Sequence, residues 1–146
     1  MIALDTNILV YAHRSDSDWH DGATACIRGL AEGTTPWAIP WPCVHEFLAI
    51  ATHARIYDPP TPLGHAVEQV AAWLESPTLA LLGEGRDYWP IAADLIRDGR
   101  ATGPRVHDAR VAALCLAHGV RELWTADRDF TRFTALAVRN PLVPEA

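Results

Sequence analysis

Hydrophobic and polar positions alternate along the chain in blocks that predict strands separated by helices. Short apolar runs are typical of buried strands, and they occupy residues 1–4, 78–82, 122–125 and 136–138, with a brief extended piece at 37–39. Apolar residues at helical spacing predict helices over residues 6–12, 19–31, 63–74, 87–96 and 104–118, and a further helix that starts at Pro40 and Pro42 and is ended by Asp58-Pro59-Pro60. This order predicts an α/β sandwich with a mostly parallel sheet, whose ligands bind beyond the carboxyl ends of the strands.

The chain is short enough to form one domain. Its 146 residues, 49% of them hydrophobic, predict a single domain over residues 1–146 with one core. No apolar run approaches the roughly 20 residues needed to cross a bilayer, and Asp5 interrupts the apolar start that a signal peptide would need. We therefore expect a cytoplasmic protein with no membrane contact. Cys26, Cys43 and Cys115 have no metal or redox spacing, so we expect three reduced core cysteines.

The formal charge of -6 argues at first against a nucleic-acid partner, because such proteins are usually basic. Five of the acids discussed below would be neutralised if they bound cations, which would leave a formal charge of only -1 elsewhere. All twelve basic residues are arginines, whose planar guanidinium binds two phosphate oxygens at once. The charge therefore does not exclude RNA.

Four carboxylates occur where an apolar element begins, ends or is interrupted. Asp5 ends the first strand, and Asp127 follows the strand at 122–125. Asp108 lies in the first turn of the most apolar helix, and Glu46 interrupts another apolar helix. Singly, each has an ordinary explanation as a cap, a turn residue, a first-turn acid or an exposed helix position.

Together, the four acids and their neighbours form a pattern that covers nearly the whole chain. It consists of Leu4-Asp5-Thr6-Asn7, a lone Glu46, Val106-His107-Asp108-Ala109 and Leu123-Trp124-Thr125-Ala126-Asp127-Arg128-Asp129-Phe130. This pattern resembles the PIN domain and, more closely, the VapC-type toxins of bacterial toxin–antitoxin pairs. The resemblance implies a PIN-like three-layer α/β/α sandwich and a metal-dependent endoribonuclease that leaves a 5′-phosphate and a 3′-hydroxyl.

The resemblance also implies roles for particular residues. Asp5, Glu46, Asp108 and Asp127 would form the catalytic, metal-binding centre, with Asp129 as a fifth ligand or an outer residue. Asn7 and Thr125 would be supporting residues that orient the carboxylates, as outer groups commonly do around metals. Hard carboxylate oxygens without a matching set of His or Cys suit Mg²⁺ or Mn²⁺ rather than zinc.

The expected partners follow from the same resemblance. They are an RNA substrate, a small antitoxin protein that sends a basic side chain toward the acids, and a second copy of the chain in a homodimer. The best candidates for RNA phosphate contacts are arginines that lie near the acids in sequence: Arg14, Arg105, Arg110, Arg128 and Arg132.

Three other functions compete with that of a nuclease. A phosphatase of the haloacid-dehalogenase type needs a proton-donating Asp two residues after the first, where this chain has Asn7. A zinc protease needs a second His four residues after His45, and Ala49 stands there. A non-catalytic module that uses the acids to hold an ion or a basic partner would have the same residues, so the sequence leaves this alternative open.

Overall fold

The computed structural model describes residues 1–144 and contains the predicted alternation of strands and helices. The strands are β1 (Ile2–Leu4), β2 (Trp37–Pro40), β3 (Leu79–Leu82), β4 (Glu122–Trp124) and β5 (Val138–Arg139). The helices are α1 (Thr6–His13), α2 (His20–Glu32), α3 (Trp41–Ala51), α4 (Leu63–Leu74), α5 (Tyr88–Asp98) and α6 (Arg105–Ala117), with a 3₁₀ helix, η1 (Arg128–Arg132).

All five strands are parallel and lie in the order β3-β2-β1-β4-β5. The chain first builds the sheet outward from β1 through β2 to β3, and then returns to the other side of β1 with β4. The direction of building therefore reverses between β1 and β4. In open α/β sheets such a switch point leaves a crevice at the carboxyl ends of the strands, where ligands bind.

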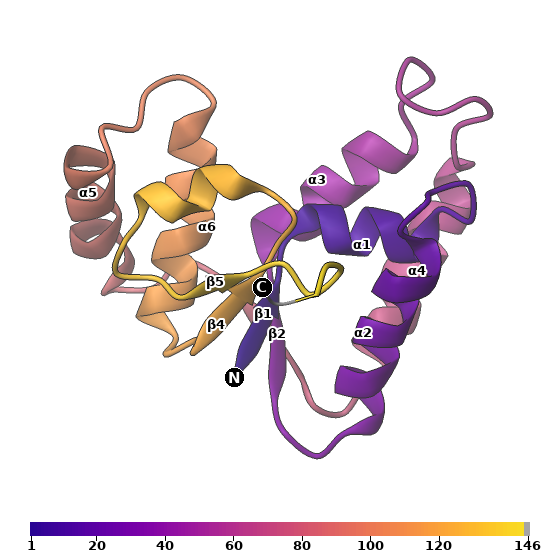
Figure 1. Cartoon of the computed structure of the whole chain (residues 1–146), viewed down its shortest axis with the longest axis horizontal. Coiled ribbons are helices and arrows are strands. Elements are labelled where there is room, and N and C mark those ends of the chain that lie inside the picture. The colour runs from indigo at the N-terminus through magenta and orange to yellow at the C-terminus, as the bar shows by residue number, and fades with distance from the viewer. Residues whose placement is uncertain (145–146) are drawn as a thin grey trace.

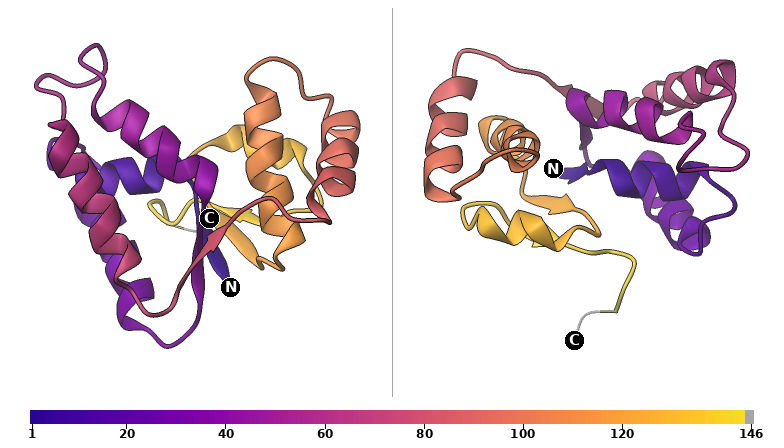
Figure 2. Two further views of the ribbon diagram at one scale, coloured as in Figure 1. Left: turned by 180° about the vertical axis from the view of Figure 1, so that it is seen from behind. Right: turned by 90° about the horizontal axis from the view of Figure 1, so that it is seen from above.

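The helices form two groups on opposite sides of the central strands. Figure 1 shows α1 to α4 together on one side and α5 with α6 on the other, and the views in Figure 2 agree. This arrangement confirms the predicted three-layer α/β/α sandwich. The core joins the inner strands to buried faces of α1, α3 and α6, and its largest fully buried side chains include Trp37, Phe47 and Phe130.

The structure corrects the prediction that residues 37–39 are only a brief extended piece. They belong to β2, which lies inside the sheet between β1 and β3 and is buried along its whole length. Residues 127–130, expected as a loop, also contain part of η1, which begins when the Asp127 side chain accepts a hydrogen bond from the Asp129 N–H.

The predicted end of the third helix was wrong as well. Helix α3 ends at Ala51, well before Asp58. The Thr52 hydroxyl donates to the carbonyl of Leu48 at 2.7 Å, and the carbonyl of Ala51 accepts from the Thr61 N–H at 2.8 Å. Groups that follow the helix in the chain thus hydrogen-bond the carbonyls of its last turn, and residues 52–60 form a loop beside the site.

Two smaller expectations concern cysteines and membranes. Cys43 and Cys115 are buried as expected, but Cys26 is only partly buried because it lies on the outer part of α2. Among the described residues, no helix is long and apolar enough to cross a membrane.

Candidate active site

The site begins at the switch point between β1 and β4. Leu4 is paired with Trp124, and the Asp5 N–H donates to the carbonyl of Trp124 at 3.0 Å. This register places Asp5, the first residue after β1, beside Thr125, the first residue after β4. The Thr125 hydroxyl donates to Asp5 Oδ2 at 2.8 Å, which joins two segments that are 120 residues apart in the chain.

Asp5 is buried and accepts hydrogen bonds on both oxygens. Oδ1 accepts from the Thr6 N–H at 2.8 Å and from the Cys43 thiol at 3.6 Å. Oδ2 accepts from the Thr125 hydroxyl and, at 3.3 Å, from the Asn7 amide. Because all four donors are neutral, they fix the orientation of the carboxylate without cancelling its charge.

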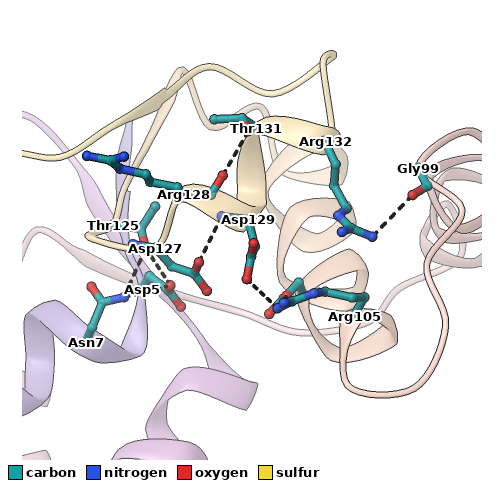
Figure 3. A network of polar contacts seen from close by, with 11 residues as sticks. Asp5, Asn7, Gly99, Arg105, Thr125, Asp127, Arg128, Asp129, Thr131 and Arg132 are labelled. Carbon is teal, nitrogen blue, oxygen red and sulfur yellow. Dashed lines mark hydrogen bonds and ion pairs between the residues drawn. The ribbon is translucent and has the colours of Figure 1, made fainter.

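Asn7 and Thr125 lie where supporting residues were expected. The Asn7 amide also donates to the Thr125 hydroxyl at 3.0 Å, and its carbonyl oxygen accepts from the Ala126 N–H at 3.0 Å. The Thr125 hydroxyl accepts from the Asp127 N–H at 3.0 Å. These bonds hold the start of α1 against the loop after β4 and thereby set the position of Asp127 relative to Asp5 (Figure 3).

The other two acids come from the helices on either side. Glu46 lies on α3, one turn after the buried Cys43, and Asp108 lies in the first turn of α6. The structure brings Asp5, Glu46, Asp108 and Asp127 to the wall of one cavity of about 250 Å³. The rest of this wall is formed by Thr6, Asn7, Val10, Tyr11, Ile50, Tyr57, His107 and Val111.

Burial and mutual repulsion raise the pKa values of three of these carboxyls. The pKa of Asp5 is raised to about 6, first because burial disfavours the charged form, and the hydrogen bonds offset only part of this. Partial burial and then Asp108 raise the pKa of Glu46. Burial also raises the pKa of Asp108, although Arg105 opposes that change. The cavity thus holds negative charge that the protein itself leaves largely uncompensated.

Asp129 lies outside this wall. Its carboxylate forms an ion pair with Arg105, and the same guanidinium lies 3.3 Å from Asp108 Oδ2. Figure 3 shows Arg105 between Asp129 and α6, apart from the group around Asp5. The structure therefore joins Asp129 to the acidic centre through an arginine.

The arginines near the acids are placed unequally. Arg105 and Arg110 line a second cavity of about 460 Å³ that shares Glu46 and Asp108 with the first, although Arg110 is paired with Glu84. Arg14 lies outside both cavities and is paired with Asp16.

The two arginines of η1 take different directions. Figure 3 shows the Arg128 side chain directed away from Asp129 and Arg105. Arg132 is directed toward the carbonyl of Gly99, at 3.4 Å. Neither residue lines the cavity that holds the four acids.

Two residues of the cavity wall are missed by sequence reasoning. His107, to which the sequence assigns no role, lines both cavities, and its presence beside Glu46 opposes the increase in the Glu46 pKa. Thr6 reads in the sequence only as a helix cap. Its hydroxyl is the one buried side-chain polar atom of residues 1–144 without a well-formed hydrogen bond. Its weaker interactions with Cys43 and Glu46 still oppose the increase in the pKa of both groups. No signal in the sequence separates this threonine from an ordinary helix-start residue.

The donor set of the cavity fits a hard divalent cation. It offers four carboxylates, and the unpartnered Thr6 hydroxyl could hydrogen-bond a water that accompanies an ion. Within residues 1–144, however, no three His, Cys, Asp or Glu side chains already form a group that could hold an ion. The acids share a cavity without forming a closed coordination shell.

The family model of the PIN domain matches residues 2–136 of the chain. The matched residues include β1 to β4 and the six α-helices. The chain therefore belongs to the PIN-domain family, and the phosphatase alternative is excluded.

Within the PIN-domain family, the chain is similar to proteins of one kind. The chain is 34% identical over 142 residues to "VapC ribonuclease Mb2897" of Mycobacterium bovis, covering 97% of this chain and 96% of that protein. It is 32% identical to "Ribonuclease VapC33" of Mycobacterium tuberculosis, with coverage of 97% and 99%. The solved structure of VapBC2 from Rickettsia felis, bound to a DNA fragment from its promoter, shares the fold with a TM-score of 0.67 at 21% identity, with coverage of 96% and 98%. Within the PIN family, the chain groups with the VapC ribonucleases.

Proposed function

We propose that this chain is the ribonuclease toxin of a toxin–antitoxin pair, and that Asp5, Glu46, Asp108 and Asp127 bind the Mg²⁺ or Mn²⁺ on which RNA cleavage depends. The observation that carries the proposal is the convergence of these four acids, from four separate segments, on one cavity at the switch point of the sheet. A bound cation would supply a water of lowered pKa as nucleophile and positive charge for the scissile phosphate.

The residues of the chain position the reacting groups. Thr125 and Asn7 keep the Asp5 carboxylate in one orientation. Asp127 is held by two bonds: its N–H donates to the Thr125 hydroxyl, and its carboxylate accepts from the Asp129 N–H. Such preorganisation matters because a misplacement of about 1 Å can cost on the order of a hundredfold in rate. His107 adds a polar group where the two cavities meet.

The second cavity supports a path for the RNA backbone. It adjoins the acids and carries Arg105, Arg110 and two histidines, His45 and His107. Phosphates bound beside these groups would bring a neighbouring phosphodiester to the acidic centre. Positive charge beside a negatively charged centre also offers a reason why an acidic chain can bind RNA.

Cleavage assays would test this proposal directly. Purified protein is incubated with a panel of defined RNAs in Mg²⁺, in Mn²⁺ and in chelator, beside a D127N variant. We expect cleavage only with metal, products that carry a 5′-phosphate, and no cleavage by D127N. A wild-type protein that binds the ions but leaves every RNA intact would favour the non-catalytic module instead.

The partner proposals have separate tests. We propose that a small antitoxin binds the toxin and directs a basic side chain toward the acids, because the cavity carries uncompensated negative charge. Co-expression with the neighbouring reading frame should yield a complex without ribonuclease activity.

We also propose a homodimer, and light scattering that shows a monomer at micromolar concentration would contradict it.

A further inference from the structure

The cavity that holds the four acids is also lined by apolar side chains, which have no role in metal-dependent cleavage. Val10 and Tyr11 of α1, Ile50 of α3 and Val111 of α6 line it, together with Tyr57 from the loop after α3. These side chains offer no metal ligand of the kind that Mg²⁺ prefers. They form a wall of aliphatic groups and two phenol rings that is continuous with the acids.

Tyr57 is held in place by a group outside the cavity. The Arg14 guanidinium lies over its ring, 4.2 Å from the centroid, in a cation–π contact. Arg14 is itself held by two hydrogen bonds to Asp16, at 2.9 and 2.6 Å, and by one to Thr61 at 3.3 Å. The Arg14 side chain is only 11% exposed. The arginine expected to contact RNA therefore supports a ring of the cavity wall.

Thr61 connects this support to the body of the protein. Its hydroxyl is 3.0 Å from His13 Nε2, and its N–H donates to Ala51 at the end of α3. The loop that carries Tyr57 is thus fastened at its far end to both α1 and α3. A ring held this way loses little conformational freedom when a ligand packs against it, which favours binding.

We propose that the apolar part of the cavity, lined by Val10, Tyr11, Ile50 and Tyr57, binds one nucleobase of the RNA, next to the phosphodiester that the acids cleave. This subsite rests on the proposed ribonuclease function. In a nucleotide a flat, largely apolar ring is joined to a phosphate through one sugar, and the cavity presents an apolar wall beside a cation-binding one.

The geometry also restricts the form of the substrate. A base that packs against this wall, inside the cavity, cannot remain stacked and paired in a helix, so the cleaved nucleotide must be unpaired or turned out of its stack. Contacts between a base and an aromatic side chain are worth roughly 5- to 150-fold in affinity per base. This is the size of effect expected from loss of the Tyr57 ring.

The experiment is a cycle that changes the protein and the base together. Wild type, Y57L and Y57F are assayed on a single-stranded RNA that the wild type cleaves, and on copies in which the nucleotide on either side of the cleaved bond lacks its base. Y88L, which removes a tyrosine at the start of α5 outside the cavity, is the matched control. Binding is measured by fluorescence anisotropy in a D5N background, and circular dichroism checks that each variant is folded.

We expect Y57L to lower kcat/KM roughly 5- to 150-fold on the intact RNA, and Y57F and Y88L to remain near the wild type. Removing the base at one of the two positions should cost the wild type a similar factor, and should cost Y57L nothing further. If Y57L cleaves the intact RNA as fast as the wild type, and the wild type cleaves the base-free copies as fast as the intact RNA, the subsite alone is wrong. If the wild type cleaves no RNA of the panel used to test the proposed function, the ribonuclease proposal is wrong and the subsite with it.

A protein side chain is the competing occupant of the apolar wall. If Y57L cleaves RNA like the wild type but loses affinity for the co-expressed antitoxin, the wall belongs to the protein partner and the base subsite is wrong.

Discussion

The acids around the cavity are held in two different ways. Asp5 is buried and is oriented by four neutral donors, so its charge has no counter-ion. Asp108 and Asp129, with side chains 21% and 41% exposed, share the charged Arg105. The first arrangement leaves a buried charge without hydration or a counter-ion, and the second pairs the charges.

This difference indicates where a cation would matter most. Neutral hydrogen bonds fix geometry, but they do not repay the loss of hydration of a buried charge. The pKa of Asp5 is therefore raised to about 6, whereas Arg105 opposes the increase in the pKa of Asp108. A metal ion would stabilise Asp5 most, because no charge of the protein already does so.

The first way to test the comparison is to remove the charge of Asp5 while keeping its shape. We expect D5N to lose cleavage by more than the roughly 100-fold that is typical when a supporting residue around a metal is lost. D94N, at an exposed ion pair of α5, is the control and should retain full activity. Retained cleavage by a folded D5N would show that the buried acid is not part of the catalytic centre.

The second test uses pH. In the folded, metal-free protein Asp5 holds its proton up to about pH 6, against an ordinary pKa of 3.8. The native state therefore binds more protons between these values, so this group stabilises the fold below about pH 4, and the contribution is lost as the pH rises through 6. Its size is about 3 kcal/mol. Thermal melts in chelator from pH 4 to 7 should show a smaller loss for D5N than for the wild type.

Added Mg²⁺ provides the internal control for this pH effect. A cation favours the carboxylate, so the wild type should regain stability at pH 7 and D5N should regain less. Parallel pH profiles for the two proteins in chelator would mean that burial of Asp5 carries no electrostatic cost.

Much of the fold and part of the site were predictable from the sequence, because they depend on local patterns. Helical spacing of apolar residues marked α4 and α6 closely, and the motif around Asp5 and Asp127 identified residues that do line one cavity. Position within the sheet was not predictable for β2, because a short apolar run does not reveal which strands will lie on both of its sides.

The features that were missed depend on contacts between distant segments. The end of α3 is set partly by Thr61, and Arg14 is directed to Asp16 and Tyr57 rather than toward the acids. The unpartnered Thr6 hydroxyl is equally invisible in the sequence, since the residue type does not reveal which buried hydroxyl will lack a partner. Such contacts follow from the assembled fold and not from the residue type or its neighbours.

The third test concerns that hydroxyl. Replacing Thr6 by Val keeps the shape and removes a buried polar atom without a partner, which costs roughly 1–3 kcal/mol where it is present. We therefore expect T6V to melt at or above the wild-type temperature in chelator, and to bind Mn²⁺ more weakly in calorimetry if the hydroxyl serves a water that accompanies the ion.

Thr61 offers the matched control, because it is also a buried threonine but its hydroxyl is fully engaged with His13 and Arg14. T61V should melt below the wild type and leave Mn²⁺ affinity unchanged. If T6V destabilises the metal-free protein as T61V does, the Thr6 hydroxyl has a structural role.

The smallest expected effect concerns Arg105, on the exposed side of the comparison. Its ion pairs with Asp108 and Asp129 are partly solvent-exposed, so each is worth at most about 1 kcal/mol. R105Q removes a positive charge beside the acids, and we expect Mn²⁺ to bind roughly 2- to 5-fold more tightly. The KM for RNA should rise, because the same guanidinium lines the proposed backbone path. R97Q, which breaks the exposed pair with Asp94 on α5, should change neither value. Metal affinity and RNA affinity should change in opposite directions only if Arg105 lies beside both the metal site and the RNA path. If R105Q instead binds Mn²⁺ more weakly, this arginine holds Asp108 in a binding position and does not compete with the ion.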